Sequence, residues 1–222
     1  MRIDGAILDL DYTLFSPRSI PRAVFAPLFD AVRRANVGAA ALTPAQVDAA
    51  FETAWDQPFD EVVRRHALPA ALQHAWRRAQ RDLRITVPLQ AYPDVAALAG
   101  LVVPLVLVTS GYRATQESKI AALGIAPLFR SVHIDAVDEP SQPLGKLAIF
   151  QAIVAEYGWA ADRTLAIGDS AESELAAGQE LGMITVQVLR PGVVACASAD
   201  YRIQSLTELT PLFGLGRPET AT

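Results

Sequence analysis

The stretch Ala6-Ile7-Leu8-Asp9-Leu10-Asp11-Tyr12-Thr13-Leu14 lies close to the N-terminus and combines an apolar run with two aspartates. A short apolar run such as residues 6–10 is typical of a buried strand. Asp9 and Asp11 fall at the C-terminal end of this run. We therefore predict a strand that presents two carboxylates at one edge of a sheet.

Further apolar runs along the chain end in polar residues in the same way. Residues 105–108 are followed by Thr109 and Ser110, and residues 164–167 by Gly168 and Asp169. Shorter strand candidates cover 131–134, 184–188 and 201–203, and helical patterns cover 93–101, 113–123, 146–157, 172–181 and, as a last turn, 207–213. Alternating strands and helices predict an α/β fold whose parallel sheet is covered by helices on both faces.

A long helical stretch interrupts this alternation after the first strand. Apolar residues recur at helical spacing over 24–32, a capping box at Thr43 predicts a helix over 44–55, and another helix begins after Pro69. We therefore divide the chain into an α/β core of residues 1–16 and 91–222 and an inserted all-helical cap of residues 17–90. We expect the tail 214–222 to be poorly ordered.

The bulk composition narrows the class of protein. The 222 residues are 51% hydrophobic with a net charge of −5, which disfavours nucleic acid and anionic membranes as partners. The N-terminus lacks the pattern of a signal peptide, and the longest apolar run, 101–108, is far shorter than the roughly 20 residues that span a bilayer. A single cysteine, Cys196, fits a reducing compartment. We expect a cytoplasmic monomer or homodimer.

The polar residues predicted at the strand ends suit phosphate chemistry. Ligands bind beyond the carboxyl ends of the strands in doubly wound sheets, where Asp9, Asp11, Thr109, Asp169 and Lys146 are expected to meet. Crowded carboxylates favour a hard cation such as Mg²⁺. Asp9 is then a candidate nucleophile, and Asp11, two residues on, a candidate acid and base.

In these motifs the chain resembles the haloacid dehalogenase superfamily, specifically its phosphatases with a Rossmann-like core and a helical C1-type cap, as in subfamily IA. Residues 9–14 resemble the first motif, D-x-D-x-T-[LV]. Thr109-Ser110-Gly111 resembles the second, with Gln116, Lys119 and Leu123-Gly124 at the usual spacing. Lys146 resembles the third, and residues 168–174 resemble the fourth, G-D-S-x-x-x-[DE].

The resemblance implies a role for each matched residue. Asp9 is nucleophile and metal ligand. Asp11 is the acid/base and gives a backbone carbonyl to Mg²⁺. Lys146 stabilises the phosphoryl charge, as the other lysine, Lys119, falls in the middle of a helix. The remaining roles are phosphate binding by Thr109 and Ser110 and metal binding by Asp169 and Glu174, with Glu172 a rival of Glu174 for the metal.

The predicted function is Mg²⁺-dependent hydrolysis of a small phosphorylated metabolite. Dehalogenase members lack the second aspartate of the first motif, and phosphonatases use a cap lysine, which residues 17–90 lack. A phosphotransferase or phosphomutase of the same superfamily remains an alternative, as does a non-catalytic binding domain that kept the fold. In the cap we expect Trp55, Phe59 and Trp76 to pack in the core rather than line a pocket. The pairs Arg64-Arg65 and Arg77-Arg78 are expected to lie on solvated faces of predicted helices, with binding of a substrate anion by Arg81 or Arg64 as the less favoured alternative.

Overall fold

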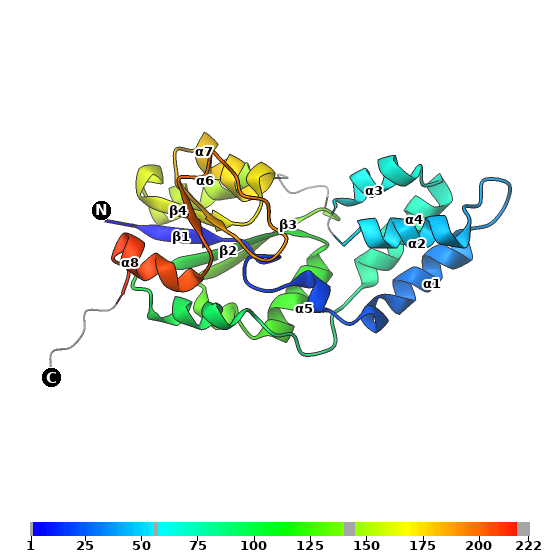
Figure 1. The fold of residues 1–222 in the computed structure, drawn as a ribbon, viewed down its shortest axis with the longest axis horizontal. Coiled ribbons are helices and arrows are strands. Elements are labelled where there is room, and N and C mark those ends of the chain that lie inside the picture. The colour runs from blue at the N-terminus through cyan, green and yellow to red at the C-terminus, as the bar shows by residue number, and fades with distance from the viewer. Residues whose placement is uncertain (1, 56, 140–144, 217–222) are drawn as a thin grey trace.

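The computed structural model describes residues 2–55, 57–139 and 145–216. Its centre is a parallel sheet in the order β3-β2-β1-β4-β5-β6 (Figure 1). The strands are β1 Gly5–Leu8, β2 Leu105–Gly111, β3 Ser131–Ala136, β4 Thr164–Gly168, β5 Ile184–Val188 and β6 Tyr201–Ile203. The predicted α/β class is confirmed, and β2 and β3 extend further toward the carboxyl edge than the apolar runs indicated.

Helices cover both faces of this sheet, because successive side chains of a strand point to opposite sides. On one face, Ala6 and Leu8 of β1 share a core with Ile120 of α5 and Phe213 of α8. On the other face, Ile7 lies in a second core together with residues of α6 and α7. These helices are α5 Arg113–Leu123, α6 Lys146–Tyr157, α7 Ala176–Glu180 and α8 Leu209–Phe213.

Four helices lie beyond the carboxyl edge of the sheet, on the right in Figure 1. They are α1 Ala26–Ala35, α2 Pro44–Thr53, α3 Phe59–His66 and α4 Ala70–Asp82. They enclose a hydrophobic cluster of their own, which includes Leu28, Phe51 and Trp76. The predicted cap corresponds to this unit, whose limits at residues 17 and 90 stay a prediction.

Several local expectations differ from the structure. The segment predicted as a helix over 93–101 forms a 3-10 helix, Pro93–Gly100, and the one over 172–181 opens with a π-helical turn, Ala171–Leu175, before α7. The expectation of a poorly ordered tail is wrong for residues 214–216: Leu215 is buried and its carbonyl accepts a hydrogen bond from Val102 N at 3.0 Å. The rest of that tail lies outside the described residues.

A buried arginine ties the loop after β1 to the start of the Pro93–Gly100 helix. The Arg190 guanidinium donates to Thr13 O at 3.1 and 2.8 Å, pairs with Asp94 at 2.8 and 3.0 Å, and lies over the Tyr92 ring. Burial raises the pKa of Asp94, but the hydrogen bonds from Arg190 and Leu206 N outweigh it and leave that pKa below its usual value. Arg190 therefore fixes the loop after β1, which carries Asp9 and Asp11, to the start of the Pro93–Gly100 helix.

We expect Arg190→Met to lower the free energy of unfolding by about 3 kcal/mol, because it removes the counter-charge of the largely buried Asp94 and the guanidinium hydrogen bonds to Thr13 O. Arg163→Met is the matched control. Arg163→Met breaks the ion pair between Arg163, which is half exposed, and Asp4. It should lower the free energy of unfolding by less than about 1 kcal/mol. Urea denaturation at pH 7 measures both. Equal losses would contradict the anchoring role of Arg190.

Candidate active site

The site begins where β1 and β4 end side by side. The backbone N–H of Asp9 donates to Ile167 O at 3.0 Å, which continues the pairing of the two strands by one residue. Asp169 follows β4 directly. Parallel pairing therefore brings two carboxylates, 160 residues apart in sequence, to one point of the sheet edge.

Glu174 completes a cluster of three carboxyl groups. Asp9, Asp169 and Glu174 each offer an oxygen, and these oxygens lie within 4.8 Å of one another. Glu174 sits on the π-helical turn and accepts a hydrogen bond from Ser170 N at 3.2 Å. A Cβ on Gly168 would approach the Glu174 side chain to 2.6 Å, so glycine is needed there for the glutamate to reach the cluster.

Lys146 supplies the positive charge beside these carboxylates. As the first residue of α6, it places its Nζ 2.5 Å from Asp9 Oδ1 and also donates to Glu174 Oε1. The preceding Gly145 has φ of +113°, a conformation that favours glycine, and its N–H donates to Asp135 Oδ1 at 3.1 Å. Asp135 thus fixes the start of the helix that carries Lys146.

Burial and crowding shift the pKa values of this cluster. Burial raises the pKa of Asp9 well above its usual value, although the charge of Lys146 opposes the shift. Burial and the charge of Glu174 raise the pKa of Asp169 to about 7. Burial lowers the pKa of Lys146, but the charges of Asp9 and Glu174 dominate and raise it above its usual range. The site holds more negative charge than one ammonium group balances.

Asp11 lies apart from the carboxyl cluster and faces a different lysine. Both oxygens of Asp11 accept hydrogen bonds from Lys119 Nζ, at 2.8 and 3.0 Å, and Oδ2 also accepts from Gln116 Nε2 at 3.1 Å. The middle of α5, where the sequence suggested no site role for Lys119, therefore points at the second aspartate. Tyr12, the residue after Asp11, has φ of 57°, a left-handed conformation rare for a non-glycine residue.

The two predicted phosphate-binding hydroxyls occupy different settings. Thr109 is buried, and its Oγ1 accepts a hydrogen bond from Gln116 Nε2 at 2.5 Å. Ser110 is exposed, and its Oγ donates to Asp135 Oδ2 at 3.0 Å. Both residues lie at the same sheet edge as Asp9, and their contact with phosphate stays a prediction.

Glu172 and Glu174 occupy different environments, and which of them binds the metal stays a prediction. Glu174 is 2% exposed and belongs to the carboxyl cluster, whereas Glu172, two residues earlier on the same turn, is exposed to solvent. Only the side chain of Glu174 faces Asp9 and Asp169 among these two.

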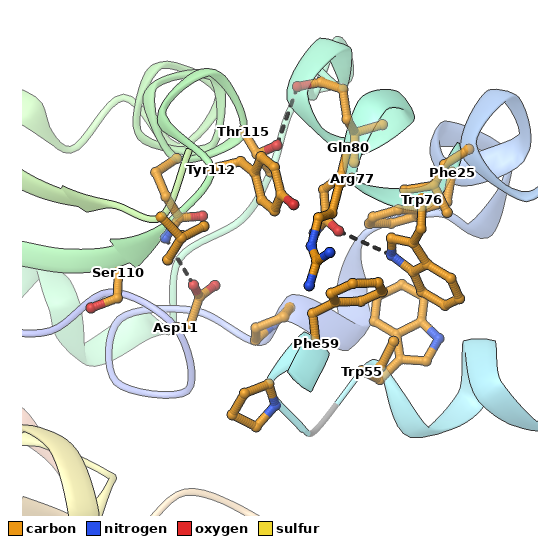
Figure 2. Close-up of a pocket in the computed structure, with 18 of the residues that line it drawn as sticks. Asp11, Phe25, Trp55, Phe59, Trp76, Arg77, Gln80, Ser110, Tyr112 and Thr115 are labelled. Carbon is orange, nitrogen blue, oxygen red and sulfur yellow. Dashed lines mark hydrogen bonds between the residues drawn. The ribbon is translucent and has the colours of Figure 1, made fainter. Parts of the chain in front are cut away.

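A cavity of about 730 Å³ opens between the sheet edge and the helices α1–α4. Asp11 and Ser110 lie at one end of it, and Phe25, Trp55 and Trp76 lie at the other (Figure 2). The expectation for the cap aromatics holds only in part: Trp76 is buried in the cap core, yet Trp55, Phe59 and Trp76 all line this cavity. Arg81 lines it too, while Arg64 pairs with Glu61.

Comparison with known proteins identifies the family. Residues 3–182 match the family model of haloacid dehalogenase-like hydrolases. The chain belongs to this hydrolase family. Solved structures agree in fold: the putative HAD-hydrolase YfnB from Bacillus subtilis bound to magnesium (20% identity, 96% of this chain and 99% of that one, TM-score 0.64) and a HAD phosphatase from Thermococcus onnurineus (21%, 98% and 100%, 0.64).

A curated relative of this hydrolase extends the comparison to a named activity. The glyceraldehyde 3-phosphate phosphatase of Methanocaldococcus jannaschii is 30% identical over 133 residues. The match covers 56% of this chain and 57% of that protein, so the chain spans a little over half the length of its relative. Among the described residues of this family member, no helix is long and apolar enough to cross a membrane.

Sequence reasoning missed three residues that shape the site of this hydrolase. Lys119 and Gln116 were noted for their spacing alone, without a contact to Asp11. Asp135 was missed, although its place at the end of a predicted strand beside Thr109 and Ser110 was a usable signal. The carboxyl end of β3 meets the same sheet edge as the ends of β1 and β2.

Proposed function

We propose that the chain is a magnesium-dependent phosphatase that hydrolyses a small-molecule phosphate monoester through an aspartyl phosphate on Asp9. The observation that carries this proposal is the buried cluster of Asp9, Asp169 and Glu174 with the Lys146 ammonium group beside it. Asp11, two residues after Asp9, lines a cavity of about 730 Å³ that is large enough for a metabolite. The family of the chain and its phosphatase relative support the same activity.

The residues of the cluster fit a hard divalent cation. Three carboxyl groups share a site with one ammonium group, and the raised pKa values of Asp9 and Asp169 show that their ionised forms lack sufficient compensation. Oxygen ligands of this kind suit Mg²⁺. We assign the ligands to the side chains of Asp9, Asp169 and Glu174 and the backbone carbonyl of Asp11. When bound, the ion neutralises phosphoryl oxygen charge and favours the ionised form of Asp9.

Hydrolysis then divides into two displacements at phosphorus. In the first, an Asp9 carboxylate oxygen forms a bond to phosphorus as the bond to the leaving oxygen breaks, and protonated Asp11 gives its proton to that oxygen. In the second, Asp11 takes a proton from water, whose oxygen attacks phosphorus and releases Asp9 and inorganic phosphate. Lys146 stabilises the negative charge of the phosphoryl group, and Thr109 and Ser110 donate hydrogen bonds to its oxygens.

The proposal is tested with para-nitrophenyl phosphate in Mg²⁺ and in EDTA, together with thermal melts in the same buffers. We expect turnover only with Mg²⁺, and a melting temperature that rises with Mg²⁺ concentration because the ion binds the folded state. Glu174→Gln should lower the Mg²⁺ affinity that is derived from the rise in melting temperature at least about 10-fold. Glu172→Gln is the matched control and should leave the response unchanged. Turnover that persists in EDTA would refute the metal dependence.

A further inference from the structure

The cavity is larger than the proposed reaction requires. In the proposed reaction the phosphoryl group lies next to the polar end of the cavity, which Asp11 and Ser110 line, and the cavity volume of about 730 Å³ falls within the range of pockets that bury metabolites of moderate size. A leaving group of three carbon atoms would fill only a small part of the 730 Å³. The far end must therefore be explained by a larger leaving group.

Two aromatic rings that line the cavity toward that end, those of Trp55 and Phe59, are not fully buried. Trp55 is half-buried and meets Phe25 edge to face, with ring centres 4.9 Å apart. Phe59 is also half-buried and lies 5.3 Å from Trp76. Aromatic rings open to a cavity gain most from an apolar or aromatic partner that stacks on them.

A cation stands between the polar and the aromatic end. Arg77 of α4 reaches into the space between Tyr112 and Phe59, and its guanidinium lies over the Phe59 ring, 5.1 Å from the centre (Figure 2). Its ion pair with Asp60 is 3.5 Å long, and the Asp60 side chain is 92% exposed. Such a pair is weak, so a substrate anion can replace Asp60.

Among the described residues three cations line the cavity, Arg77, Arg81 and Lys119, and Arg77 is the one whose guanidinium lies over the ring of Phe59. Lys119, another lining cation, already donates to both oxygens of Asp11. Tyr112 is half-buried beside Arg77, and burial raises the pKa of its phenol, so the phenol stays a neutral hydrogen-bond donor at pH 7. A ligand anion at this point meets a guanidinium and a hydroxyl donor together.

We infer, given the phosphatase function proposed above, that the leaving group of the substrate is an aromatic body that carries a carboxylate or similar anion. Its ring stacks against Trp55 and Phe59, and its anion pairs with Arg77. Arg77 is a specificity-determining residue in this arrangement, and it takes no part in the displacement at phosphorus.

The test compares esters that differ only in the anion. Benzyl phosphate has a neutral aromatic leaving group, and its 2-, 3- and 4-carboxy derivatives have leaving groups that carry a carboxylate. Glycerol 3-phosphate provides a small leaving group without an aromatic ring. All these leaving groups are alkyl alcohols of similar reactivity. For the best carboxybenzyl isomer, Arg77→Ala should lower kcat/KM by about 10- to 100-fold, the value of a charge-assisted hydrogen bond. For benzyl phosphate the loss should stay below about threefold.

Two further variants complete the design. Arg78→Ala is the matched control, since Arg78 is the next residue of α4 and does not line the cavity. Arg78→Ala should leave kcat/KM unchanged both for the best carboxybenzyl ester and for benzyl phosphate. Trp55→Leu should lower kcat/KM for every benzyl ester while sparing glycerol 3-phosphate. The inference is overturned if Arg77→Ala affects charged and neutral esters equally, or if glycerol 3-phosphate is the better substrate of the unaltered enzyme.

Binding separates this inference from the proposed function. Phosphonates in which CH₂ replaces the bridging oxygen of the carboxybenzyl esters are titrated by calorimetry with the wild type and Arg77→Ala. If the variant binds the phosphonates more weakly but the wild type hydrolyses no ester, the proposed phosphatase function is refuted and the role of Arg77 in binding an aromatic anion is supported. Hydrolysis of the esters without any dependence on Arg77 would do the reverse.

Discussion

Replacing Asp9 by Asn is expected to reduce phosphatase turnover by at least about 10⁴-fold, because a carboxamide cannot act as the nucleophile at phosphorus. The loss should not come from unfolding. Asn has the shape of Asp, and the ionised form of Asp9 is disfavoured by burial, which raises its pKa. Lys146 also keeps its contact with Glu174. The free energy of unfolding in EDTA should therefore change by less than about 1.5 kcal/mol.

The measurement pairs steady-state kinetics with urea denaturation of the same preparation. Asp4→Asn is the matched control. Asp4 lies directly before β1, whereas Asp9 lies directly after it, and Asp4 contacts Arg163 rather than the residues of the candidate active site. Asp4→Asn should keep turnover within about twofold of the wild type. If Asp9→Asn is folded and retains more than a hundredth of the wild-type turnover, Asp9 is not the nucleophile.

Replacing Lys146 by Met should have the second-largest effect, and it should affect both activity and stability. Turnover should fall by about 10²- to 10³-fold, because a preorganised charge beside the phosphoryl group is lost. In EDTA the free energy of unfolding should fall by about 3–5 kcal/mol, because Asp9 and Glu174 stay buried without a counter-charge. Mg²⁺ should restore part of this stability, since it supplies positive charge to the same carboxylates.

The pH dependence of the Lys146 contribution follows from the direction of its pKa shift. The folded state raises the pKa of Lys146 above its usual value. The stabilisation by this protonated lysine is therefore fully present below its unfolded pKa, about 10.4, and is lost as the pH rises through the folded pKa. On the alkaline side, the difference in stability between wild type and Lys146→Met should begin to narrow above about pH 10.4.

Lys119→Met serves as the comparison for this prediction. Lys119 faces Asp11, whose side chain is 26% exposed, so water can solvate the aspartate when the lysine is removed. The stability loss in EDTA should be clearly smaller than for Lys146→Met. Equal losses from the two variants would mean that Asp9 and Glu174 depend on Lys146 no more than the partly solvated Asp11 depends on Lys119.

One helix and one chain end show where sequence patterns were insufficient. The limits of helix α3 were not predicted, because Pro58 stands at its N-cap in place of a side-chain acceptor and Ala67, with φ of 47°, ends it where glycine is usual. The tail was expected to be poorly ordered, yet Gly216 pairs with Leu101 far away in sequence. Both features depend on contacts outside the local pattern.

Sequence patterns were sufficient to predict the α/β class, the order of strands and helices, and the motif residues at the strand ends. These follow from local rules: apolar periodicity defines the elements, and parallel pairing brings the carboxyl ends of the strands to one edge. Only the tertiary structure placed Glu174 rather than Glu172 among the carboxylates, turned Lys119 and Gln116 toward Asp11, and set Arg77 between Tyr112 and the cap aromatics. Those contacts join residues from separate helices and strands, so their geometry is set by how the elements pack and not by their order along the chain.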